Sequence, residues 1–360
     1  MRLRVVLPEG YAERPSGGNE YDRRICAGLA ARGWDVRITT IPGPWLPPGA
    51  RVEPALVEAL DAAPAGATVL VDGLIASPAA RVVVPRAERL RLAVLLHMPL
   101  ATAVGHGIDD AARVSEYAVL SAAEVVIVPS RWTQERLVGL GHPPDRVVVA
   151  TPGVDPVPRR VRPLSSAVPR LLCVGAVARH KGQDVLVEAL AAARDRAWTC
   201  ALVGALDSDP DFVRALRDAI EHHGLGGRIR LVGPLPRPRL EAEYERADLL
   251  LHPSRGETYG MVVAEALAHG LPVIASDVGG LPEALGQAPA ACLVPPDDPA
   301  ALAQALTRWL DDPRHRDALL AAAARRAPTL PTWDDTTARI SEALGRPDTT
   351  RRLVGRLADM

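Results

Sequence analysis

Short apolar runs alternate with helical stretches along this chain, and this alternation is what most constrains its fold. The runs are three to five residues long and rich in Val, Leu, Ile and Ala, and the stretches between them are rich in Ala, Leu and Arg. Such alternation is typical of βαβ units, which build parallel sheets covered by helices on both faces. In the first half we expect strands at 4–7, 35–39, 69–71, 93–96, 125–128 and 147–150.

The alternation stops once and then restarts. Residues 156–169 are rich in proline and arginine and lack periodicity, which is typical of an interdomain linker. Further strands are expected at 170–174, 199–203, 228–232, 249–252 and 272–275. We therefore expect an α/β protein with two Rossmann-like, doubly wound domains facing a cleft. These domains are residues 1–155 and 170–328, and the tail 329–360 contains an expected helix at 333–344.

Composition narrows the class of protein. The chain has 360 residues, of which 48% are hydrophobic, enough for two cores. A formal net charge of -1 gives no overall footprint for nucleic acid. No apolar run reaches the roughly eighteen residues of a spanning helix, and the N-terminus turns polar too early for a signal peptide. The cysteines lack metal-type spacing and predict free thiols in a reducing cytoplasm; they are Cys26, Cys173, Cys200 and Cys292.

A single lysine stands out among the basic residues. Lys181 is the one lysine among 42 basic residues, and Arg179 lies two positions before it. Lysine presents a compact ammonium and arginine a planar fork, so the two together suit the oxygens of a diphosphate. The alternative interpretation is drift in a chain biased toward arginine.

Two glutamates flank an expected helix start. Glu257 lies in a turn-like stretch after the strand 249–252, and Glu265 lies one turn into the helix that begins near Met261. The amides of Gly260, Met261 and Val262 have no partner inside that helix, so they can bind an anion. Carboxylates on either side can accept from sugar hydroxyls. Otherwise Glu257 is a loop charge and Glu265 a solvated helix residue.

The first half supplies two further candidates. Gly17 and Gly18 lie between the first strand and the first helix, where a glycine-rich loop can approach a phosphate, although no dinucleotide fingerprint is completed. His97 follows the strand 93–96, at the carboxyl end where doubly wound sheets bind ligands. The alternative for His97 is a structural histidine.

Two other motifs have simpler interpretations. Asp207 and Asp209 form a DxD pattern of the kind that binds metals, but Asp209 before Pro210 is a natural helix start. No metal site is therefore expected there. Gly279 and Gly280 permit close approach of the backbone to a ligand, or simply form a strand-to-helix turn.

Taken in order, these pieces resemble the retaining glycosyltransferases of family 4, which have the GT-B fold. The stretch 175–182 is similar to the family's VGRLxxxKG element, Glu257 and Glu265 match its E-x7-E signature, and 271–283 matches GxPVVASxxGGxPE. The resemblance is densest over 170–298. Trp333 opens a segment similar to the C-terminal helix that returns to the first domain in this family.

The resemblance implies a hexosyltransferase that uses a nucleotide-diphosphate sugar, with neither metal nor cofactor. Arg179 and Lys181 would neutralise the diphosphate, Glu257 would hold sugar hydroxyls, and Glu265 would bind the ribose. His97 would touch the donor sugar, so the catalytic set is His97, Arg179, Lys181 and Glu257. The remaining donor contacts would be Gly17, Gly18, Thr258, Tyr259, Gly260, Met261 and Val262.

Several questions stay open at this point. The family's EGFG is Glu257-Thr258-Tyr259-Gly260 here, which leaves the donor sugar open, UDP- or GDP-linked. The acceptor is a small molecule, a glycan or a lipid-linked molecule; peripheral membrane contact through arginine-rich stretches is not favoured. Other functions on the same fold are a sugar phosphorylase, a nucleotide-sugar epimerase and a non-catalytic nucleotide-sugar-binding protein.

Overall fold

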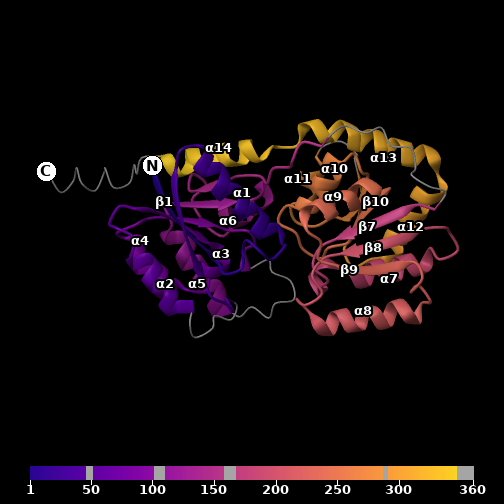
Figure 1. Ribbon diagram of the computed structural model, residues 1–360, viewed down its shortest axis with the longest axis horizontal. Helices are drawn as coiled ribbons and strands as arrows, with labels where there is room; N and C mark the ends of the chain where they lie inside the picture. Colours follow the sequence, from indigo (N-terminus) through magenta and orange to yellow (C-terminus); the bar gives the residue numbers. More distant parts are fainter. Residues whose placement is uncertain (46–51, 101–109, 158–167, 287–290, 347–360) are drawn as a thin grey trace.

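The computed structural model describes residues 1–45, 52–100, 110–157, 168–286 and 291–346. Its strands form two parallel six-stranded sheets, one in each half of the described chain. The two lobes lie side by side, each with helices on both faces of its sheet (Figure 1). The expected α/β architecture of two doubly wound units is confirmed. The predicted linker lies largely outside the described residues.

The first sheet has the strand order β2-β1-β3-β4-β5-β6, and all its pairs are parallel. The expected strands are present, displaced by at most two residues at their ends. The strands are β1 (Arg2–Pro8), β2 (Asp35–Ile41), β3 (Thr68–Asp72), β4 (Arg91–Leu95), β5 (Val125–Val128) and β6 (Val147–Val149).

The second sheet has the order β12-β11-β10-β7-β8-β9, again with parallel pairs throughout. Its last strand, β12, was not expected from the sequence. The strands are β7 (Arg170–Val174), β8 (Thr199–Val203), β9 (Ile229–Gly233), β10 (Leu249–His252), β11 (Val273–Ser276) and β12 (Ala291–Val294).

Helices divide the core of the first lobe into two layers. Ile25 and Leu29 of α1 pack with Ile340 of α14 on one face of the sheet, and Leu56 of α2 packs with Val83 of α4 on the other. Ser16 caps α1 by accepting from the Asn19 amide. The helices are α1 (Gly17–Ala31), α2 (Val52–Asp61), α3 (Gly73–Ala76), α4 (Ala80–Ala87), α5 (Asp110–Ala122) and α6 (Arg131–Gly139).

The second lobe repeats this layering. Helices α7, α8 and α12 pack on one face of its sheet, and α10, α11 and α13 pack on the other. Asp209 caps α8, as the helix-start interpretation of that motif predicts. The helices of this lobe are α7 (Gln183–Ala192), α8 (Pro210–His222), α9 (Arg237–Arg246), α10 (Met261–Ala268), α11 (Leu281–Leu285), α12 (Pro299–Asp311) and α13 (Pro313–Arg326), with 3₁₀ turns η2 (Arg179–Lys181) and η3 (Ala327–Thr329). The last helix, α14 (Trp333–Gly345), packs on the first lobe.

Each sheet has one point where the chain direction across it reverses. In the first sheet β1 lies between β2 and β3, and in the second β7 lies between β8 and β10. The loops that follow the two central strands at such a point run to opposite faces, which opens a crevice at the carboxyl ends of the strands. The loops after β1 and β3, and after β7 and β10, are therefore the natural ligand-binding segments.

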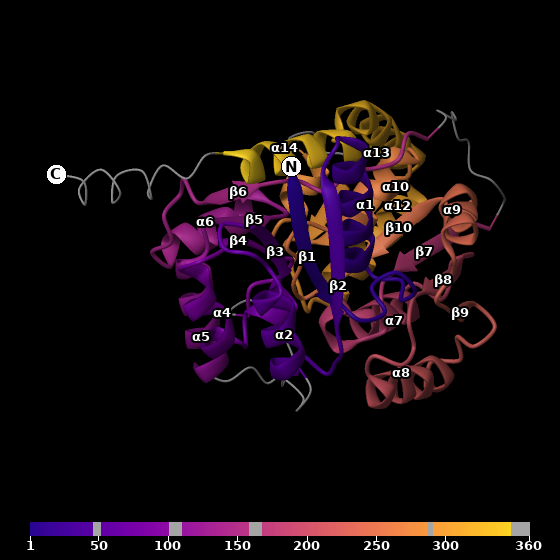
Figure 2. The same ribbon diagram turned by 60° about the vertical axis from the view of Figure 1, so that its left-hand side comes forward.

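The chain passes between the lobes twice, and the two passages are bonded together. The Val154 amide donates to the Pro331 carbonyl at 2.9 Å, and the Thr336 hydroxyl donates to the Thr151 carbonyl at 2.6 Å. Helix α14 then runs back along the first lobe (Figures 1 and 2). It packs against α1, and the Trp34 indole donates to Ser341 at 2.9 Å.

Two general expectations are also met within the described residues. None of the described helices is long and apolar enough to cross a membrane. All four cysteines are free thiols, and three of them are buried.

The packing of α1 on α14 generates a stability prediction. A Cβ at Gly28 would lie 2.4 Å from Oγ1 of Thr337. Gly28→Ala should therefore destabilise the fold by about 1–3 kcal/mol, although alanine normally stabilises a helix interior. Thr337→Ala in the same chain should recover most of the loss.

Urea unfolding of the single and double variants measures the effect. Gly226→Ala is the matched control, because a Cβ there meets nothing within 4 Å. A Gly28→Ala variant as stable as the parent chain would contradict the close packing of α1 and α14.

Candidate functional site

An ion pair between two loops lies at the centre of the site. Lys181 ends the 3₁₀ turn η2 after β7, and Glu257 lies in the loop after β10; Nζ of Lys181 donates to Oε1 of Glu257. The same oxygen lies 3.0 Å from Nε2 of His252 and 3.1 Å from Oγ of Ser254. Oε2 of Glu257 has no hydrogen bond to any described residue, so it is available to a ligand hydroxyl.

This environment keeps Glu257 ionised. Burial alone would favour the neutral carboxyl, but the Lys181 ammonium and the hydrogen bond from His252 hold the pKa of Glu257 well below its usual range. The side chains are 19% exposed for Lys181 and 9% for Glu257, so solvent screens the pair only weakly. The site therefore presents a fixed carboxylate and a fixed ammonium next to each other.

Two glycines explain why these loops can meet. Gly182 has φ +68°, and a Cβ there would lie 2.1 Å from the Pro253 carbonyl oxygen. Gly279 has φ +57°, and its Cβ would lie 1.8 Å from the Glu257 carbonyl oxygen. Side chains would push the loops apart at both points. The close approach considered for Gly279 and Gly280 is thus made to the Glu257 loop: the Gly280 amide donates to the Glu257 carbonyl at 3.0 Å.

Arg255 braces the η2 turn and was not foreseen from the sequence. Its Nη1 donates to the Arg179 carbonyl at 2.5 Å and to Asp184 at 2.9 Å, while Nε donates to Asp297 at 2.5 Å. The Arg179 side chain itself is exposed, with its guanidinium carbon 5.6 Å from the centre of the Phe212 ring. In this structure Arg179 therefore lies at the rim, whereas Lys181 lies inside.

The start of α10 follows directly after Glu257. Gly260 is the N-cap residue with φ +93°, and the helix begins at Met261. The first amides of a helix have no partner within it, so the amides of Met261 and Val262 can receive an anion. Thr258 is half-buried, whereas Tyr259 is 2% exposed and packs into the core. Any contact of Tyr259 with a ligand would come from its backbone.

Glu265 is buried and not a solvated helix residue. Its Oε1 accepts from Nη1 of Arg237 at 2.5 Å, and its Oε2 accepts from the Tyr244 hydroxyl at 2.8 Å. Nη2 of Arg237 also lies 3.4 Å from Oδ2 of Asp155, and the same Asp155 oxygen pairs with Arg24 of α1. Burial lowers the pKa of Arg237, but the charge and hydrogen bond of Glu265, together with the charges of Glu241 and Asp155, outweigh it, so the net shift is upward. A chain of ion pairs thus links Glu265 to the first lobe.

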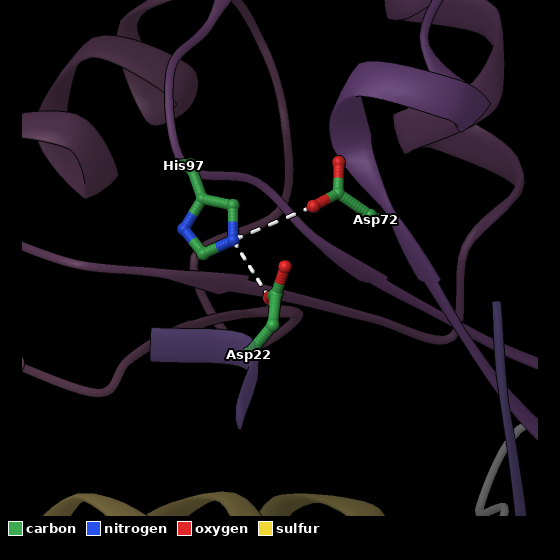
Figure 3. A group of neighbouring side chains, drawn as sticks. All are labelled: Asp22, Asp72 and His97. Atoms are coloured by element: carbon green, nitrogen blue, oxygen red, sulfur yellow. Dashed lines mark hydrogen bonds and ion pairs between the residues drawn. The ribbon is translucent and has the colours of Figure 1, made fainter. Parts of the chain in front are cut away.

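His97 belongs to a buried polar group in the first lobe. Its Nε2 lies 2.9 Å from Oδ1 of Asp22 on α1 and 3.5 Å from Oδ2 of Asp72 at the end of β3 (Figure 3). Neither aspartate was predicted from the sequence. Asp72 directly follows the predicted strand 69–71, just as His97 follows the predicted strand 93–96, and this shared position is a usable signal. Asp22 lies inside a helix, where the sequence gives no such signal.

Gly17 and Gly18 are the first residues of α1, not the loop before it that the sequence had indicated, and they join this group to the second lobe. A Cβ at Gly18 would lie 3.4 Å from Cδ2 of His97, and one at Gly17 would lie 3.4 Å from Sδ of Met261. Met261 packs against the α1–α14 core cluster as well as its own. The start of α1 therefore faces the start of α10. The structure brings Lys181 and Glu257 together directly, and it brings Gly17, Gly18 and His97 to the same edge.

The second lobe matches a known family. Residues 168–312 match the family model described as glycosyl transferases group 1. D-inositol 3-phosphate glycosyltransferase of Thermomonospora curvata is 34% identical in an alignment of 274 residues that covers 69% of this chain and 63% of that protein. D-inositol 3-phosphate glycosyltransferase 1 of Catenulispora acidiphila is 35% identical in an alignment of 232 residues that covers 59% of this chain and 55% of that protein. The chain thus matches less than two thirds of the length of either relative.

Solved structures match nearly the whole chain. Sucrose-phosphate synthase (tll1590) from Thermosynechococcus elongatus has a TM-score of 0.81 at 24% identity and covers 99% of this chain and 100% of its own. Anabaena Alr3699/HepE in complex with UDP and glucose has a TM-score of 0.79 at 21% identity, covering 96% and 100%. At these identities the likeness shows the fold.

These comparisons agree on the fold and on the class of the second lobe. Its two parallel doubly wound sheets match glycosyltransferases of the GT-B architecture. Residues 168–312 of its second lobe match the family model described as glycosyl transferases group 1. The GT-B fold and the glycosyltransferase resemblance of this lobe, both inferred from the sequence motifs, are confirmed.

The ion pair between Lys181 and Glu257 should contribute to the free energy of unfolding. Lys181→Met and Glu257→Gln should each destabilise the fold, because each leaves a largely buried charge without its partner. The double variant should lose less than the sum, with a coupling of at least about 1 kcal/mol. Urea unfolding of the four chains measures it.

Arg214 and Asp211 supply the control cycle. Their side chains are 70% and 86% exposed, so solvent screening should leave little coupling between them. Equal coupling in the two cycles would mean that the Lys181–Glu257 contact adds nothing beyond an ordinary surface pair.

Proposed function

We propose that the protein is a retaining glycosyltransferase that moves a hexose from a nucleotide-diphosphate sugar to an acceptor hydroxyl without a metal ion. One observation carries the proposal: the Lys181–Glu257 pair lies beside the start of α10. Both loops follow strands at the point where the second sheet reverses direction. A cation, free amides and a carboxylate are what a sugar diphosphate needs within one crevice.

The diphosphate would be held by Lys181 and the amides of Met261 and Val262. As the bond between the anomeric carbon and the diphosphate oxygen breaks, negative charge grows on the diphosphate. A fixed ammonium and fixed amide dipoles stabilise that charge without reorganisation. Arg179 lies at the rim of the same loop and would add a second cation by turning inward from Phe212. Because these cations neutralise the leaving group, a metal is not required.

The two glutamates would hold the two sugars of the donor. Oε2 of Glu257 is free to accept from hydroxyls of the hexose next to the reacting carbon. Glu265 would accept from the ribose, and Arg237 and Tyr244 fix its orientation before the ligand arrives. His97 and the start of α1 at Gly17 and Gly18 would close the site from the first lobe. A phosphate oxygen of the donor can take the proton of the attacking hydroxyl.

We propose UDP as the nucleotide and a small phosphorylated molecule as the acceptor. The UDP assignment is supported by the similar fold of Alr3699/HepE, whose complexes contain UDP and glucose or UDP-glucose. The acceptor assignment is supported by the names of relatives, which refer to D-inositol 3-phosphate. The acceptor would bind mainly to the first lobe.

A substitution of Lys181 tests the chemistry. Lys181→Ala should lower kcat by about 10²–10³, since it removes one stabiliser of the leaving group. The measurement is transfer of hexose from UDP-glucose to inositol phosphate, with the anomeric configuration of the product followed by NMR. Retention of configuration is expected.

Arg196→Ala is the matched control, because Arg196 pairs with Asp311 on the surface and should keep full activity. A Lys181→Ala enzyme with near wild-type kcat would rule out the proposed role. Product release that needs only inorganic phosphate, and no hydroxyl acceptor, would instead identify a phosphorylase.

A further inference from the structure

A polar group in the first lobe consists of Asp22, Asp72 and His97 and is almost entirely buried. Asp22 is 1% exposed and Asp72 is 3% exposed, and they come from α1 and β3. His97 follows β4 at the edge that faces the second lobe. The proposed transfer assigns a role to His97 but none to the two buried carboxylates that face its Nε2.

Two carboxylates in this setting cannot both be ionised cheaply. Burial raises the pKa of Asp72 to about 7, and the charge of Asp22 and a hydrogen bond with it add to the effect. Oδ2 of Asp22 has no donor among the described residues, and a buried acceptor of this kind normally has one. A proton on Asp72, whose pKa lies at about 7, supplies a donor within the pair at lower pH, and the pair then carries one negative charge. At higher pH both carboxylates are ionised beside Nε2 of His97.

The remaining charge is balanced by His97. Burial alone would lower its pKa, but the charge and hydrogen bond of Asp22, with the charge of Asp72, raise the pKa of His97 to about 9. Nε2 is committed to the two carboxylates at 2.9 and 3.5 Å. Nδ1 points away from both of them in Figure 3 and has no partner among the described residues. In the protonated ring, Nδ1 is therefore a free hydrogen-bond donor.

The other titratable neighbours stay neutral. The Tyr21 ring stands edge-on to His97 with centroids 5.3 Å apart, and burial and the charge of Asp22 raise the pKa of Tyr21. The same two causes raise the pKa of Cys26 to about 12. Burial also raises the pKa of Tyr11. Among the described residues, His97 is the cation that pairs with these carboxylates.

We propose that Asp22 and Asp72 are positioning residues that keep His97 doubly protonated, so that Nδ1–H donates to an oxygen of the sugar donor. Gly18 at the start of α1 lies against the opposite edge of the ring, because a Cβ there would lie 3.4 Å from Cδ2 of His97. The bound group is an anionic or hydroxyl oxygen of the nucleotide sugar. This inference rests on the proposed function for the identity of the ligand, but the protonation state stands without it.

The test is a pH titration of the protein labelled with ¹⁵N-histidine, followed by NMR without ligand. The His97 signals are assigned with His97→Gln, and His142, whose pKa burial lowers, is the internal reference. His97 should titrate near the value of about 9, with both nitrogens protonated at pH 7. A His97 that titrates near the ordinary value of about 6.5 would overturn the proposal.

Two matched variants separate the roles of the carboxylates. Asp22→Asn removes the carboxylate that Nε2 contacts, so the pKa of His97 should fall by about 1–3 units. Asp72→Asn removes the carboxylate that lies farther from Nε2, at 3.5 Å instead of 2.9 Å, so the shift should be clearly smaller. Equal shifts in both variants would overturn the leading part that Asp22 has in holding the proton. Broadening of the wild-type His97 signals by added Mn²⁺ at pH 7 would show that these three side chains bind a metal ion, and it would also overturn the proposal.

Ligand binding supplies the functional readout. Affinity for UDP-glucose, measured by calorimetry across pH 6–10, should decrease as pH rises through the pKa of His97, because the free donor is lost. In Asp22→Asn the decrease should occur at a pH lower by the same shift that NMR reports. Exposed Asp61→Asn, which loses pairing with Arg86 and Arg89, should keep the wild-type profile. Failure of UDP-glucose to bind at every pH would refute the proposed donor and leave the titration result standing.

Discussion

The contact between Lys181 and Glu257 organises the candidate site at the carboxyl end of the second sheet. It joins loops that follow two neighbouring strands of the second sheet, β7 and β10. Gly182 lets the two loops approach each other at the Pro253 carbonyl, and Gly279 lets the loop after β11 support the Glu257 backbone, in both places within a distance that a Cβ would prevent. The charged pair is thus built by close backbone packing, and it lies next to the start of α10 without needing a ligand to assemble it.

The two lobes are connected around this site by polar contacts and by packing. The passages between the lobes are bonded to each other through Val154 and Pro331. Asp155 contacts both Arg24 of the first lobe and Arg237 of the second, and Arg237 in turn holds Glu265. A residue proposed to bind ribose is therefore tied to the relative position of the lobes. Ligand binding and lobe position should consequently affect each other.

The sequence predicted most strands and the core of the site, and the reasons for its failures are physical. Apolar runs such as those of β4 and β10 mark strands buried on both faces, whereas the four residues of β12 follow an Ala- and Pro-rich stretch that obscures them. Lys181 and Glu257 stand out through residue type and position. Asp22 and Arg237 do not, because their roles arise from contacts with residues far away in the chain.

We propose above all that the diphosphate of a nucleotide sugar binds at the start of α10. Amide hydrogen exchange at residues 260–262, with and without UDP-glucose, tests it most directly, because these amides have no partner inside the helix. The account predicts strong slowing of exchange there on binding, and loss of that slowing in Lys181→Ala. Unchanged exchange at these amides in the presence of bound UDP-glucose would contradict it.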